Sequence, residues 1–116
     1  MKRQFKRTDR VAELLQRELS QLIQLEIKDP RLPAFVTISS VTVSNDLNYA
    51  KVYFTILSGN KQETATVLNN AASYLRSLLA KTIKLYTMPQ LIFVYDESIE
   101  YGINLSKLID DANSYD

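Results

Sequence analysis

The sequence predicts an α+β domain in which helices cover one face of a small three-stranded sheet. Apolar residues recur with helical spacing in 11–27 and again in 65–85, which predicts amphipathic helices. Between them, 34–44 and 49–57 are rich in β-branched and aromatic residues, and 91–95 is a third short apolar segment. With the second helical segment read as two helices, the element order is helix, strand, strand, helix, helix, strand. The 116 residues fit a single domain.

The first helix is expected over residues 11–27. Thr8 or Asp9 can cap its start, and Asp29-Pro30 ends it because a residue that precedes proline avoids helical angles. Its apolar stripe should pack against the sheet rather than bind a membrane or a partner helix. The stripe consists of Val11, Leu15, Leu19, Leu22 and Ile23.

The two strands that follow should form a hairpin. In 34–44 the apolar alternation slips at Ser39-Ser40, and a β-bulge there would return the later valines to the buried face. In 49–57 the alternation is strict, so Ala50, Val52, Phe54 and Ile56 should face inward. Pro89 opens the third strand, a position that suits proline.

The helical segment 65–85 contains a weak point at 69–73, where Asn, Ser and Ala replace larger residues. Asn and Ser side chains compete with the helical backbone for hydrogen bonds, so a bend or break is expected there. The charged side chains of this segment are all basic, and no acid follows them until Asp96. Its outer surface should therefore be purely cationic.

Composition excludes several classes of function. The chain has no cysteine and no histidine, which removes disulfides, thiol nucleophiles, Ser-His-Asp catalysis and the usual zinc sites. We therefore expect no metal and no cofactor. Apolar runs are too short to cross a bilayer, and the basic start is not followed by the apolar core of a signal peptide. A cytoplasmic protein without membrane association is the expectation.

The net charge of +1 conceals a marked asymmetry. Residues 1–31 and 32–95 each carry an excess of three positive charges, whereas 96–116 carry an excess of five negative charges. A basic body favours polyanionic partners. An ordinary solvated surface with an acidic tail fits the same charges.

Basic residues concentrate in an N-terminal arm, 1–10, and recur in a proline-stiffened connector, 28–33. The arm could contact phosphates or could be a frayed terminus. The connector could hold its cations beside the first strand or could be a turn with surface charges.

The element order is the one used by type II KH domains, which bind single-stranded nucleic acid. These domains usually carry a GXXG loop, and this chain has none, since Gly59 and Gly102 lie elsewhere. A more specific resemblance is to the ribosome-binding factor A family, the bacterial small-subunit assembly factors. It is carried by Arg10-Val11-Ala12, 26–32, 41–47, Tyr49-Ala50-Lys51-Val52-Tyr53, 74–79 and Met88-Pro89-Gln90-Leu91-Ile92-Phe93 followed by Asp96.

This resemblance implies a KH-like RNA-binding domain over 11–96, then a short helix and acidic tail over 97–116. It also implies a kinked helix pair in place of the GXXG loop, aligned on Ala71, Ala72 and Ser73, where Ser stands in the position of the family's Gly. The implied function is that of a monomeric, non-enzymatic, cytoplasmic factor. It would bind the immature 30S subunit and its 16S rRNA, assist late maturation and 5′-end processing, support growth in the cold, and be linked to an assembly GTPase.

Candidates for RNA contact are then the basic residues of the arm, connector and kinked helix, with Lys51 as a weaker member. Guanidinium and ammonium groups suit phosphate contact. For each residue, plain surface solubility is the alternative. The set comprises Arg3, Lys6, Arg7, Arg10, Lys28, Arg31, Lys51, Arg76, Lys81 and Lys84.

Two other function classes remain open. An enzyme would have to use the isolated carboxylates Asp29, Asp46 and Asp96, without His, Cys or a phosphate-binding loop. A protein-interaction module would use the outer sheet face with Tyr49 and Tyr53. Binding to phosphates should weaken steeply as salt rises, whereas an apolar contact should not.

Overall fold

The computed structural model describes residues 6–98 and confirms the α+β fold class. The short helix and acidic tail expected after residue 97 lie almost wholly outside the described residues. Between residues 6 and 98, no helix combines the length and the apolar character that crossing a membrane requires. The elements in chain order are α1 (Arg7–Glu26), β1 (Val36–Val43), β2 (Tyr49–Ile56), α2 (Lys61–Asn70), α3 (Ala72–Thr82) and β3 (Gln90–Tyr95).

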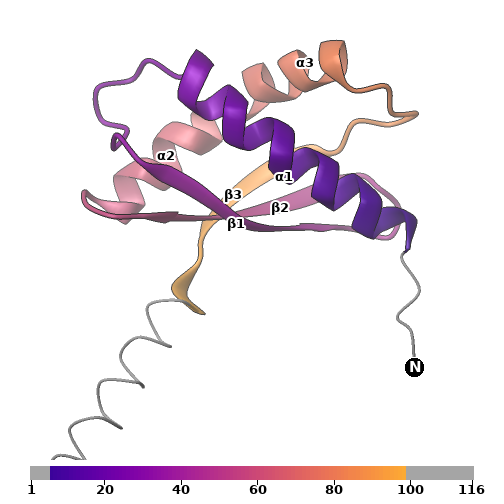
Figure 1. Ribbon diagram of the computed structural model, residues 1–116, viewed down its shortest axis with the longest axis horizontal. Helices are drawn as coiled ribbons and strands as arrows, with labels where there is room; N and C mark the ends of the chain where they lie inside the picture. The colour runs from indigo at the N-terminus through magenta and orange to yellow at the C-terminus, as the bar shows by residue number, and fades with distance from the viewer. Residues whose placement is uncertain (1–5, 99–116) are drawn as a thin grey trace, which may run out of the picture.

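The sheet has the order β1-β2-β3, with β1 antiparallel and β3 parallel to the central strand β2. A parallel pair needs a long crossover connection, and α2 and α3 supply it. Figure 1 shows all three helices over the same face of the sheet. The opposite face is therefore not covered by any helix of the described chain.

The predicted β-bulge in β1 is confirmed at Ser39. Ile38 pairs with Phe54 and Ser40 pairs with Tyr53, so Ser39 is the extra residue. Val36 and Ile38 before the bulge and Val43 after it are all buried, as the corrected alternation requires. The Ser39 hydroxyl donates to Asp96 Oδ2 at 2.6 Å, which ties the bulge to the chain leaving β3.

The core lies between β2 and the helices. Ala50, Val52 and Phe54 of β2 are completely buried, as the sequence predicts, while Ile56 is half-buried. Each large apolar side chain removed from water in this way contributes about 1.5–3 kcal/mol. Helix α1 packs over β1, while α2 and α3 pack over β3. The helices contribute to the same core Leu15, Leu19 and Ile23 from α1, Leu68 from α2, and Leu75 and Leu79 from α3.

Three helix boundaries differ from the expectation by several residues, the first of them at the start of α1. Helix α1 begins at Arg7 rather than at residue 11, with Lys6 as the N-cap, and Arg7 and Arg10 therefore belong to the helix instead of the arm. Asp9 closes this end from inside the helix by accepting the Lys6 backbone N–H at 3.1 Å.

The second helical region runs from Lys61 to Thr82 rather than over 65–85. It starts early because the Asn60 side chain caps it, accepting the Glu63 backbone N–H at 2.8 Å. It ends early because Ile83 adopts extended angles.

The expected break lies at Ala71, between α2 and α3. Ala71 has φ −90° and ψ −1°, and its N–H is shared between the carbonyls of Val67 and Leu68, each at 3.1 Å. Within residues 6–98, positive φ angles occur only at Leu47 and Gly59. The kink therefore needs no left-handed backbone, and Ser73 is accommodated inside α3.

Asn69, two residues before the break, attaches α2 to the outer edge of β3. Its side-chain amide donates to the Phe93 carbonyl at 3.0 Å, and its Oδ1 accepts the Phe93 N–H at 2.8 Å. The amide thus pairs both backbone groups of an edge-strand residue, as a neighbouring strand would.

We expect replacement of Asn69 by Ala to lower the free energy of unfolding by about 1–2 kcal/mol, because two hydrogen bonds to β3 are removed. Asn70→Ala is the matched control, since Asn70 is exposed at the end of the same helix, and it should change stability by less than about 0.5 kcal/mol. Urea unfolding of both variants measures the difference. Equal losses of stability in the two variants would contradict the role given to Asn69.

Candidate nucleic-acid interface

The start of α1 and the end of α3 both lie toward the right side of the molecule in Figure 1, the start of α1 lower and the end of α3 higher in the view. Helix α3 starts beside the end of α1, where the Tyr74 hydroxyl donates to Glu26 Oε2 at 3.3 Å, and the two helices diverge from there at an oblique angle toward the right of Figure 1. Exposed cations from both helices meet the solvent at this end. We call this set the cationic end: Lys6, Arg7, Arg10, Lys81 and Lys84.

Within the cationic end, α3 supplies the charges with the fewest acidic neighbours along the chain. Lys81 lies in the last turn of α3, where a positive charge is favoured by the helix dipole. Lys84 is exposed just beyond the C-cap. The segment from residue 64 to residue 95 contains no acid, so no carboxylate within it offsets these charges.

Arg76, also on α3, has a structural contact. Its Nε and Nη2 both donate to the Met88 carbonyl, at 3.1 and 2.7 Å, which fastens the loop before β3 to the helix. A carbonyl does not neutralise a guanidinium, so Arg76 adds its charge to this surface while it positions the loop.

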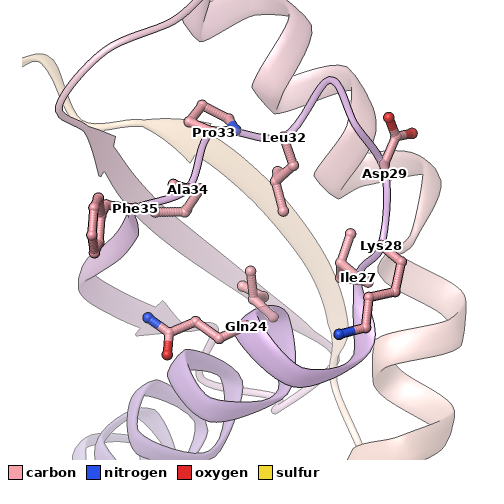
Figure 2. Close-up of a pocket in the computed structure, with 10 residues that line it drawn as sticks. Gln24, Ile27, Lys28, Asp29, Leu32, Pro33, Ala34 and Phe35 are labelled. Carbon is pink, nitrogen blue, oxygen red and sulfur yellow. The ribbon is translucent and has the colours of Figure 1, made fainter.

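The connector forms the other basic region, beside a pocket of about 430 Å³ between the end of α1 and the start of β1. Figure 2 shows the Leu32 side chain pointing into this pocket, the Lys28 amino group at its edge, and the Asp29 carboxylate turned away. The pocket floor is apolar, with Ile23 and Val36 buried.

Arg31 is engaged within the connector rather than presented to a partner. Its Nη2 lies 2.8 Å from Asp29 Oδ2, and its Nε and backbone N–H donate to Asp29 Oδ1 at 3.1 and 2.9 Å. The hydrogen bonds from Arg31 lower the pKa of Asp29 to about 2. Of the two predicted connector cations, Lys28 is thus the one without a carboxylate partner within residues 6–98.

The remaining predicted residues do not join these groups. Lys51 is exposed on the helix-free face of the sheet, between Thr42 and Ile92, and so lies opposite α3. Arg3 lies outside the described residues. The nine basic candidates within residues 6–98 therefore divide among the cationic end, the loop-fastening Arg76, the connector and the far sheet face.

Sequence reasoning missed two further residues beside the cationic end. Arg17 shares a shallow hollow on α1 with Arg10, and their spacing of seven residues on one helix could have indicated this. Tyr86 projects from the loop after α3 with 97% of its surface exposed. The position of this aromatic residue, two after Lys84, could have indicated that it belongs to the same surface.

The three isolated carboxylates do not form a shared site. Asp29 pairs with Arg31, Asp46 accepts the Ser44 hydroxyl at 2.7 Å in the hairpin turn, and Asp96 accepts the Ser39 hydroxyl. These hydroxyl bonds lower the pKa of both Asp46 and Asp96. Across residues 6–98, no group of acidic side chains is placed to hold a metal ion.

Comparison with known proteins gives a consistent family match. The family model described as Ribosome-binding factor A matches residues 7–109. A Legionella pneumophila (strain Lens) protein named Ribosome-binding factor A is 60% identical over 116 residues, covering 100% of this chain and 94% of the relative. The namesake from Methylobacillus flagellatus is 50% identical over 112 residues, covering 97% of this chain and 89% of the relative.

Solved structures with the same fold carry the same name. The crystal structure of ribosome-binding factor A from Thermus thermophilus has a TM-score of 0.70 and 26% identity, covering 78% of this chain and 97% of that one. Coordinates of a homology model of the Thermus thermophilus factor, fitted into a cryo-EM map of a complex with 30S, have a TM-score of 0.64 and 27% identity. That match covers 74% of this chain and 91% of the other.

The Asp29–Arg31 pair gives a prediction in pH. Because the pKa of Asp29 in the folded protein is about 2, below the ordinary value, the pair contributes stability above the ordinary pKa. That contribution is lost as the pH falls toward about 2. Carboxyl NMR titration of Arg31→Gln should show the pKa of Asp29 raised toward its ordinary range, with Asp46 unchanged as the internal control. Identical Asp29 titrations in the two proteins would show that Arg31 does not set this pKa.

Proposed function

The chain belongs to the ribosome-binding factor A family, and from this premise we propose that it binds the free or immature 30S subunit through 16S rRNA. The observation that carries the proposal is the cationic end, where folded elements hold exposed Lys and Arg side chains. The Thermus thermophilus relative, fitted into a map of a 30S complex, supports the choice of partner.

The proposed contacts are to phosphates. Lys and Arg on rigid elements position a protein on RNA without reading base edges, and RNA helices are recognised chiefly by shape. Lys81 and Lys84 are the principal candidates because neither has a carboxylate nearby in the chain. Lys6, Arg7 and Arg10 would extend the interface along the start of α1.

We propose the biological role that family membership favours. The factor would act in the cytoplasm as a monomer, assist late 30S maturation and processing of the 16S rRNA 5′ end, and support growth in the cold. An assembly GTPase would be its functional partner. It would act by binding and would catalyse no reaction, a proposal that accords with the structural use of its three isolated aspartates in local hydrogen bonds.

The test is the double variant Lys81→Gln/Lys84→Gln in co-sedimentation with immature 30S subunits over a range of salt concentrations. Removal of one lysine–phosphate interaction should reduce the slope of log affinity against log salt by about 1, so the double variant should show a reduction of about 2. Lys51→Gln, on the opposite face, is the matched control and should bind as the wild type does.

Thermal unfolding provides the second control. The substituted lysines are exposed, so all variants should remain within about 0.5 kcal/mol of the wild type. A double variant that folds normally and keeps both the affinity and the salt slope of the wild type would remove the end of α3 from the interface.

A further inference from the structure

The loop between α3 and β3 presents Tyr86 to solvent. This side chain is 97% exposed, the most exposed of the large apolar or aromatic side chains in residues 6–98. A ring of this size gains free energy when an apolar or aromatic surface covers it. The groups that surround Tyr86 indicate which kind of partner could supply that surface.

The loop is held in place although Tyr86 is exposed. Ile83 and Pro89, at its two ends, are buried, and Leu85 packs partly into the core. Exposure alternates along the intervening chain, so Lys84 and Tyr86 are exposed on either side of the inward Leu85. The two hydrogen bonds from Arg76 to the Met88 carbonyl fix the later part of the loop to α3.

The charges beside Tyr86 select for an anionic partner. Lys81 and Lys84 precede it, both exposed, and Arg76 carries a third positive charge on α3. The acid-free stretch 64–95 includes the whole of α3 and the loop. An exposed apolar side chain alone is common on protein surfaces, but this ring follows two exposed lysines in a stretch of chain, 64–95, that contains no acid.

Unpaired RNA fits this combination. Proteins bind single strands by stacking bases on aromatic side chains while cations follow the phosphates. Bases within a duplex are already stacked on one another, so a protruding ring cannot reach their faces. An acidic peptide would satisfy the lysines but would leave the ring without a partner.

We propose that Tyr86 stacks on an unpaired base of the RNA while Lys84 and Lys81 contact the neighbouring phosphates. The inference rests on the proposed function and deepens it, because it assigns a single-stranded segment of the RNA to the loop after α3. The hydroxyl of Tyr86 takes no part, since stacking needs only the ring.

The experiment compares Tyr86→Ala and Tyr86→Phe with the wild type by fluorescence anisotropy. The probe is a labelled single-stranded oligoribonucleotide of about 12 nucleotides, a length within the range that single-strand-binding folds occupy, alone or annealed to its complement. Tyr74→Ala, which removes a half-exposed tyrosine from α3, is the matched control. Thermal unfolding verifies that each variant is folded.

We expect Tyr86→Ala to weaken binding of the single strand by at least about fivefold, the effect that corresponds to one stacked base. Tyr86→Phe and Tyr74→Ala should retain wild-type affinity, and binding of the duplex should change in none of the variants. The proposal is overturned if Tyr86→Ala binds the single strand as the wild type does, if Tyr86→Phe loses as much affinity as Tyr86→Ala, or if the duplex is weakened equally.

Co-sedimentation of the wild type with immature 30S subunits separates the two levels of inference. If the wild type binds subunits but Tyr86→Ala leaves single-strand affinity unchanged, only the role of Tyr86 fails. If the wild type binds neither subunits nor the oligonucleotide in dilute buffer, the proposed function fails and the role of Tyr86 fails with it.

Discussion

The parallel pairing of β3 with β2 constrains the path of most of the chain. Since β2 and β3 are parallel, β3 starts at the same end of the sheet as β2. The connection from the end of β2 to the start of β3 must therefore run back along the sheet, and it does so over the face that carries the buried β2 side chains. The α2–α3 pair both makes the crossing and covers the face. The break at Ala71 lets the crossing change direction, and the Asn69 amide holds the crossing to β3.

The same crossing positions the charges. It carries α3 from beside the end of α1 back toward the side of the molecule where α1 starts, so the end of α3 and the start of α1 supply cations to the same side (Figure 1). Arg76 then fastens the returning loop, which keeps Lys84 and Tyr86 on a fixed surface. Packing and the proposed recognition are therefore linked, because the element that closes the core also presents the groups for RNA.

Patterns local in sequence predicted the fold well. The strict alternation of β2, the slip at Ser39 and the small residues around Ala71 each depend on one segment, and each is confirmed. Helix starts were harder to predict from the sequence, because Asp9, which the sequence suggested as a cap before the helix, lies inside α1 and accepts a backbone N–H from there. The left-handed angles of Leu47 also could not be anticipated, since the sequence offered Asn and Asp for that turn.

The candidate interface was only partly predictable, because whether two basic residues share a surface depends on how elements pack. Lys51 and Lys81 were both candidates from the sequence, Lys51 the weaker, and the structure places them on opposite sides of the sheet.

The central claim is that one helix-bearing end of a rigid domain faces ribosomal RNA. Protein–RNA crosslinking on immature 30S subunits, with the crosslinked peptides identified by mass spectrometry, tests it most directly. We expect crosslinks in the start of α1, the end of α3 and the loop after it. Crosslinks confined to the helix-free sheet face around Lys51, or none in the presence of bound protein, would contradict the account.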